Sequence, residues 1–147
     1  LRTFIENSLS RKGYRNEEVK RILKDILIPT HTQRTTTSAF LQVPKDSLID
    51  IKRLVELIED SMSERTYAVL KRPAEASTVI SALKKALFVE DVVRRVLLAL
   101  VKEFRGFPDN VKVLVRVCSN ESVHKYDIFA ERLATFRELR KELNLTI

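Results

Sequence analysis

The residues with the clearest chemical potential lie near the C-terminus, where His124, Asp127 and Glu131 follow one another at spacings of three and four. On a helix these spacings place an imidazole and two carboxylates on one face, and such a set can hold a divalent cation. The same face would continue through Glu138 and Glu142, as the solvated side of a helix does. We therefore interpret these residues as a solvent-exposed ridge and expect no metal site and no cofactor.

A second group of candidates is a basic cluster near the N-terminus. Residues 1–45 contain nine basic and four acidic residues, which accounts for most of the net charge of +7. Such a cluster neutralises phosphates without reading base sequence, so it favours nucleic acid or another acidic partner. Only Tyr14 lies nearby as an aromatic residue, which argues against stacking on single-stranded bases. The candidate phosphate-binding residues are Arg11, Lys12, Arg15, Lys20, Arg21 and Lys24.

A third candidate is Leu98, which lies on the polar stripe of an otherwise apolar helix predicted over residues 88–104. At 100° per residue it falls between Arg94, Arg95 and Lys102, where a soluble helix normally carries a polar side chain. We consider two explanations. Leu98 packs under another helix of the same domain, or it lies at the base of a groove where a partner protein docks an acidic amphipathic helix.

Several common catalytic motifs are absent from the sequence. Two glycines cannot form a P-loop or a dinucleotide fingerprint, because both bring backbone amides close to phosphate. No CxxC, HExxH or GxSxG motif occurs, and Cys118 has only His31 and His124 as candidate bases. A lone cysteine also forms no internal disulfide. We interpret Cys118 as a small buried apolar residue of an intracellular protein, either cytoplasmic or nuclear.

Hydrophobic periodicity and the positions of Pro and Gly indicate the elements that must carry these residues. Apolar side chains recur at helical spacing in most of the segments predicted as helices, and Pro73 ends a short one. Gly13 tolerates a left-handed backbone and so suits the end of the first helix. The predicted helices cover residues 4–12, 16–27, 46–62, 64–71, 74–87 and 88–104.

Residues 111–117, VKVLVRV, fit two kinds of element. They alternate as a strand would, but Lys112 and Arg116 also lie four apart, as on one helix face. A strand needs a partner, and the only candidates are the weak runs at residues 38–43 and 66–70. We therefore favour a helix here and keep a strand as the alternative.

The C-terminal segment, residues 121–143, is predicted as one long helix because aromatic and aliphatic side chains recur on one face. The residues of that face are Tyr126, Phe129, Leu133, Phe136, Leu139 and Leu143. Residues 30–45 are rich in Thr and lack periodicity, so we expect a surface connection there. Arg34, directly before residues 35–37 (TTT), would suit a basic-directed kinase, and a plain polar linker is the alternative.

Composition and pattern together predict a single all-α domain over residues 1–147. The 44% hydrophobic residues can fill a core, and the longest apolar runs are too short to span a membrane. We expect a bundle of about seven helices, with basic N-terminal helices (1–28), a Thr-rich connection (30–45) and a helical core (46–147). Similar motifs, VKRIL, IKRLV and VRRVL, recur at separations of 32 and 42 residues, which is compatible with an armadillo-like or HEAT-like stack.

The predicted function is that of a non-catalytic protein-interaction or scaffolding domain of a larger intracellular protein. It follows from the helical pattern and from the missing catalytic motifs, so we do not expect an enzyme. The alternative is a nucleic-acid-associated helical domain that binds phosphate through its basic N-terminal helix. The N-terminal residues lack the apolar stretch of a signal peptide, and a start at Leu rather than Met is typical of an excised domain.

Overall fold

The chain folds as unit 1, residues 1–32, and unit 2, residues 33–147. The computed structural model describes residues 1–26, 28 and 31–143. Among these residues it contains six helices and three strands, so the predicted all-α bundle is wrong and the protein has an α+β fold. The assignment of residues 1–147 to one domain stays a prediction. In the described part of the chain, no helix is both long and apolar enough to cross a membrane.

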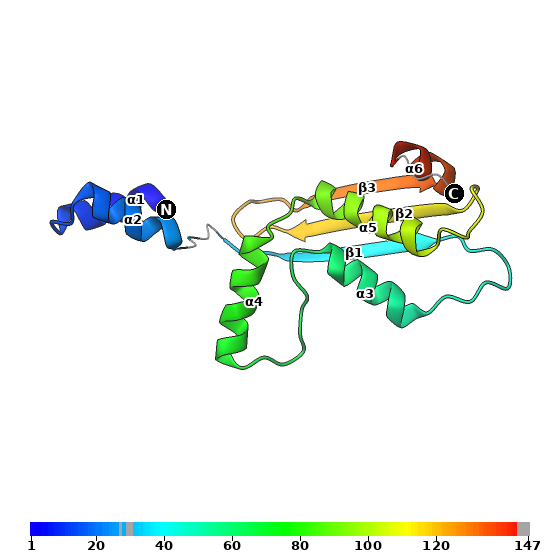
Figure 1. Ribbon diagram of the computed structural model, residues 1–147, viewed down its shortest axis with the longest axis horizontal. Coiled ribbons are helices and arrows are strands. Elements are labelled where there is room, and N and C mark those ends of the chain that lie inside the picture. The colour runs from blue at the N-terminus through cyan, green and yellow to red at the C-terminus, as the bar shows by residue number, and fades with distance from the viewer. Residues whose placement is uncertain (27, 29–30, 144–147) are drawn as a thin grey trace. The chain divides into compact units, whose positions relative to one another are not determined.

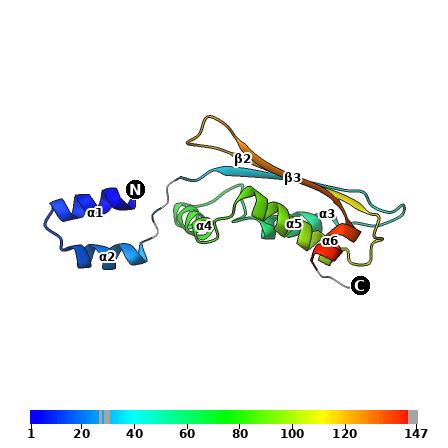
Figure 2. The same cartoon turned by 90° about the horizontal axis from the view of Figure 1, so that it is seen from above.

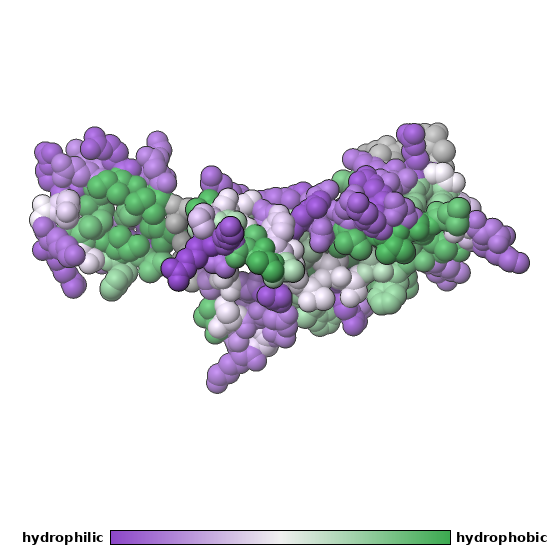
Figure 3. Space-filling view, turned by 90° about the horizontal axis from the view of Figure 1, so that it is seen from below, coloured by the Kyte–Doolittle hydropathy of each residue, from purple (hydrophilic) through white to green (hydrophobic). Residues whose placement is uncertain are grey.

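Unit 1 is a pair of helices, α1 (Arg2–Arg11) and α2 (Asn16–Asp25), as the apolar spacing predicted. The turn between them contains Gly13 with a φ of +88°, the left-handed conformation that glycine adopts without steric cost. Val19 and Leu23 lie one turn apart on α2 and are buried. Other apolar side chains of this unit stay exposed, and in Figure 3 they gather between hydrophilic residues.

Unit 2 is built on a three-stranded antiparallel sheet in the order β1 (Arg34–Leu41), β2 (Lys112–Asn120) and β3 (Ile128–Thr135). The first two strands are neighbours although three helices separate them along the chain (Figure 1). Alternate residues of a strand point to opposite faces of the sheet. Val113 and Val115 are completely buried, so this face of β2 forms one side of the core.

Helices α3 (Ile51–Ser61) and α5 (Val89–Glu103) cover one face of the sheet (Figure 2). The predictions of helices over residues 46–62 and 88–104 are confirmed, with shorter bounds. α5 is the central helix, and its Leu97 and Leu100 are buried. The core of unit 2 therefore lies between the valines of β2 and the apolar side of α5.

Helix α4 (Arg72–Lys84) confirms the helix predicted over residues 74–87. Val79 and Ile80 are more than 40% exposed, and none of the helix residues, all of them described, is buried. The short helix predicted over residues 64–71 does not form.

The prediction of a helix over residues 111–117 is wrong, because that segment is most of β2. Its partner is β1, which lies inside the predicted Thr-rich connection, residues 30–45. Thr is β-branched and therefore favours strands over helices. β1 lies at the edge of the sheet, where half of its side chains face water, so it lacks the apolar run by which a buried strand is recognised. Cys118, expected to be buried, is half-buried in β2.

The single helix predicted over residues 121–143 is also wrong, because this segment forms a loop, then β3, then α6 (Phe136–Glu142). Phe129 and Leu133 are four residues apart, a spacing that fits one face of a helix. Four is also an even number, so a strand places both residues on one face too. In β3 that face is the one opposite the helices, and the two side chains are 64% and 66% exposed.

A buried arginine holds α6 against the rest of unit 2. The side chain of Arg140 is 7% exposed and is ion-paired with the carboxylate of Asp109. Its guanidinium also donates to the backbone carbonyls of Arg105 and Phe107 at 2.7 and 2.8 Å. It lies 5.4 Å from the centre of the Phe136 ring, a cation–π distance. These contacts join α6 to the connection between α5 and β2.

Candidate functional site

The residues predicted as one helical ridge, His124, Asp127 and Glu131, lie in two different elements, so the shared helix face is wrong. His124 and Asp127 lie in the β2–β3 loop (residues 121–127), and Glu131 lies in β3. Its carboxylate is ion-paired with Arg116 of β2 at 2.6 Å. Within the residues that the structure describes, no group of three or more His, Cys, Asp or Glu side chains is placed to hold a metal ion.

Hydrogen bonds close the base of the β2–β3 loop. The carboxylate of Asp127 accepts from Nδ2 of Asn120 at 3.1 Å and from the backbone N–H of Glu121 at 3.0 Å. The carboxylate of Glu121 in turn accepts from Oγ of Ser119 at 3.1 Å and from Nε2 of Gln33 at 2.7 Å. The loop is therefore tied both to the end of β2 and to the residue before β1.

The middle of the β2–β3 loop presents an imidazole to solvent. The ring of His124 stacks on that of Tyr126, with centroids 5.6 Å apart and planes 16° apart. The loop projects beyond the end of the sheet (Figures 1 and 2). An imidazole can both accept and donate a proton, and a loop with a fixed base holds such a group in one region while leaving it accessible.

Two exposed cations belong to the same end of the sheet. Arg34 begins β1 and lies opposite Asn120, the residue directly before the β2–β3 loop. Lys125 follows His124 within that loop. The loop and the first residue of β1 thus combine acid–base chemistry with positive charge, and we take them as the candidate functional site.

The basic cluster predicted to bind phosphate lies in unit 1. Arg15 forms an ion pair with Glu18 at 2.8 Å, and this hydrogen bond lowers the pKa of that carboxyl group. All members of the cluster are exposed, so none is used in the core. Their binding of phosphate stays a prediction. The cluster consists of Arg11 and Lys12 at the end of α1, Arg15 before α2, and Lys20, Arg21 and Lys24 on α2.

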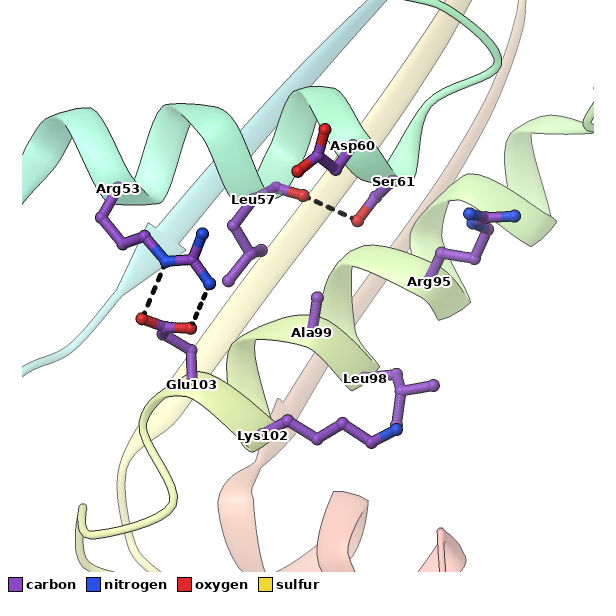
Figure 4. Close-up of a pocket in the computed structure, with 9 residues that line it drawn as sticks. All are labelled: Arg53, Leu57, Asp60, Ser61, Arg95, Leu98, Ala99, Lys102 and Glu103. Atoms are coloured by element: carbon purple, nitrogen blue, oxygen red, sulfur yellow. Dashed lines mark hydrogen bonds and ion pairs between the residues drawn. The ribbon is translucent and has the colours of Figure 1, made fainter.

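Leu98 lies in a cleft of about 510 Å³ between α3 and α5, which we call the α3–α5 cleft (Figure 4). Its apolar lining consists of Leu57, Leu98 and Ala99. Arg95 and Lys102, two of the three cations predicted beside Leu98, also line it. The third, Arg94, is not part of the lining and is ion-paired with Asp91 at 2.9 Å.

Arg53 and Glu103 form a two-pronged ion pair across the α3–α5 cleft. Nε and Nη2 of Arg53 donate to the two carboxylate oxygens of Glu103 at 3.0 and 2.8 Å (Figure 4). This hydrogen bonding lowers the pKa of the Glu103 carboxyl group below its ordinary value of 4.5. The pair connects two helices that are far apart in sequence.

We expect the substitution Glu103→Gln to make unfolding less sensitive to acid. A carboxyl group whose pKa is lower in the folded state stabilises the fold above its unfolded-state pKa, and this stabilisation is lost as the pH falls through the folded-state pKa. The wild type should thus lose stability below about pH 4.5 more steeply than the variant. Urea unfolding between about pH 3 and pH 7 measures the difference. Glu90→Gln, which alters an exposed carboxylate of the same helix, is the control, and an equal change in both variants would contradict the assignment.

Unit 2 is an α+β protein in which two helices cover one face of a three-stranded antiparallel sheet and a histidine-bearing loop extends from its end. Residues 8–130 match the model of the Type I GTP cyclohydrolase folE2 family. The chain belongs to this family.

Curated relatives align with most of this chain. GTP cyclohydrolase MptA of Methanococcus maripaludis (strain C6) is 43% identical over 136 residues, which are 92% of this chain and 43% of the relative. GTP cyclohydrolase MptA of Methanocaldococcus jannaschii is 40% identical over 136 residues, 92% of this chain and 44% of the relative. The corresponding protein of Methanothermobacter thermautotrophicus is 39% identical over 128 residues, 87% of this chain and 40% of the relative. The chain therefore spans less than half the length of these relatives.

Family membership overturns the predicted function. A non-catalytic scaffold is wrong, as is a nucleic-acid-associated domain, because the family is one of enzymes. The absence of a P-loop and of a dinucleotide fingerprint does not exclude nucleotide chemistry, because an enzyme that acts on GTP need not use either. A usable signal was the polar run at residues 119–127, SNESVHKYD, which directly follows a segment that alternates as a strand does, residues 111–117.

Proposed function

We propose that the chain is part of a GTP cyclohydrolase and that His124 is an acid–base group of its active site. Membership of the folE2 family and the relatives named GTP cyclohydrolase MptA support the activity. The observation that carries the assignment of His124 is its exposed position on a loop whose base is held by the hydrogen bonds of Asp127 and Glu121. A loop of this kind brings the imidazole to the same place in each catalytic cycle.

Hydrolytic opening of a ring requires proton transfer at two points. A bond between carbon and a ring nitrogen breaks, a bond between that carbon and a water oxygen forms, and a proton moves from the water to the departing nitrogen. A histidine side chain can accept the proton from water and then donate it to the nitrogen. In our proposal His124 performs this transfer.

Arg34 and Lys125 are the groups that we propose for the triphosphate of GTP. A triphosphate carries several negative charges, and arginine and lysine are the side chains that bind phosphate oxygens. Both residues are exposed at the end of the sheet where the β2–β3 loop begins. More than half of each curated relative lies outside the matched region, and we propose that further substrate contacts come from there.

The test is the ring opening of GTP by the purified full-length protein and by its His124→Gln variant. Loss of the guanine absorbance and of the proton NMR signal of its C8–H follows the reaction. We expect the wild type to consume GTP and the variant to lose at least about 100-fold in kcat, because general acid–base groups contribute rate factors of this order. A wild-type protein that leaves GTP intact would contradict the proposed function.

Val123→Ala is the matched control for His124→Gln. Val123 is the preceding residue of the same loop and is also exposed, but its side chain transfers no proton. This variant should keep most of the activity. Equal losses in the two variants would show that loop conformation, and not the imidazole, is what matters.

We further propose that the protein acts in the cytoplasm. Its single cysteine requires no oxidising compartment, and GTP is a cytoplasmic nucleotide. A fluorescent fusion that is found in the membrane or outside the cell would contradict this location.

A further inference from the structure

We propose that the α3–α5 cleft is a docking site for an acidic amphipathic helix of a partner protein. The cleft is formed by two helices that cover the sheet, whereas the proposed active site belongs to the loop at the end of the sheet. The inference therefore goes beyond the proposed function and does not depend on it.

The floor of the cleft supplies a small apolar contact. Leu98 is half-buried and lines the cleft together with Ala99, which is also half-buried, and Leu57, which is 6% exposed. In Figure 4 the Leu98 side chain projects from α5 beside that of Lys102. A leucine that lines an open cleft loses contact with water only when a ligand covers it, and that loss favours binding of an apolar side chain.

The charges of the cleft separate into paired and unpaired groups. Arg53 is ion-paired with Glu103, and Asp60 is ion-paired with Arg65 of the following segment. Arg95 and Lys102 have no ion pair with any residue that the structure describes. Since the two negative groups are neutralised by neighbours, the charge that is available to a ligand is positive.

The spacing of the two available cations matches that of two carboxylates on a partner helix. Arg95 and Lys102 are seven residues apart on α5, which is two turns or about 10 Å along the axis, and Leu98 lies between them. A partner helix that carries two carboxylates two turns apart, with a leucine between them, can lie along α5 with all three side chains in contact. A small polyanion fits less well, because it carries no apolar side chain that would cover Leu98.

The probe for this site is a synthetic amphipathic peptide of about 20 residues with glutamates seven positions apart on either side of a leucine. A scrambled peptide of the same composition is its control. Binding is measured by fluorescence anisotropy at low and high salt and by the NMR shift of the Leu98 methyl groups. We expect the designed peptide to bind more tightly at low salt and to shift these methyl groups, and the scrambled peptide to do neither.

A charge exchange identifies the contact. Lys102→Glu should weaken binding of the acidic peptide about 10-fold, and a peptide with lysine in place of the facing glutamate should recover the loss on this variant. Lys112→Glu changes the net charge equally but lies on β2, so it is the matched control and should leave binding unchanged. Thermal unfolding of each variant checks that the fold is kept.

Four results would overturn the proposal. The first is that the designed and scrambled peptides bind equally well, or that neither of them binds. The second is an equal effect of Lys102→Glu and Lys112→Glu, which would indicate attraction by net charge alone. The third is self-association that Leu98→Glu abolishes, because the occupant would then be a second copy. The fourth is a shift of the Leu98 methyl groups by inorganic phosphate that also displaces the peptide, because the cleft would then bind small anions.

Discussion

Replacing Phe136 with Ala should lower the free energy of unfolding by about 3–5 kcal/mol, as other buried Phe to Ala changes do. Phe136 is the first residue of α6 and is 0% exposed. Its ring stacks on that of Phe107, with centroids 6.4 Å apart, and it packs in the core of unit 2. Truncation removes the apolar area and leaves a cavity that the surrounding residues fill only in part. Urea unfolding measures the loss, provided that the slope with denaturant is unchanged.

Phe129→Ala is the matched control for this substitution. Phe129 lies seven residues earlier in the chain, but its ring is 64% exposed on the uncovered face of the sheet, where it contacts Arg116. Its truncation should cost no more than about 1 kcal/mol, because it creates no cavity and removes only an exposed cation–π contact. A loss of similar size in the two variants would contradict the placement of Phe136 in the core.

Replacing Asp109 with Ala should cost about 3 kcal/mol, because it leaves the guanidinium of Arg140 buried without its counter-charge. This figure is at the lower end for broken buried pairs, since Asp109 itself is 40% exposed and two backbone carbonyls still accept from Arg140. The measurement is again the free energy of unfolding in urea.

Arg137 supplies the control, because it faces the same carboxylate from an exposed position. Its Nε lies 3.7 Å from Asp109, and its side chain is 75% exposed. Arg137→Ala should change stability by less than about 1 kcal/mol, since exposed ion pairs contribute little. The difference between the two variants isolates the buried pair. If Asp109→Ala were as mild as Arg137→Ala, the Arg140 network would not be what holds α6 in place.

The helices were predictable because their signal is local. In α2, Val19 and Leu23 are both buried, and in α5 so are Leu97 and Leu100. Each pair shares one helix face because of its spacing, whatever else the chain does. The same reasoning placed Arg95, Leu98 and Lys102 together, and they do line one cleft.

The strands were not predictable in this way, because a strand is stable only with a partner and the partners lie elsewhere in the chain. Val113 lies opposite Leu41 of β1 on one side and Ala134 of β3 on the other. The valines of β2 also need α5 to bury them, and this makes residues 111–117 a strand although their spacing is compatible with a helix.

The same distinction between local pattern and long-range contact applies to the candidate sites. The sequence singled out His124 and Leu98 by residue type and spacing alone. Only the tertiary structure shows that His124 lies on a loop whose Glu121 is held by Gln33, 88 residues away from it. Only the tertiary structure shows, too, that Leu98 lines the same cleft as an ion pair between residues 50 apart, Arg53 and Glu103. Periodicity records which residues share a face of their own element. Contacts between distant elements depend on how those elements pack, and no single segment carries that information.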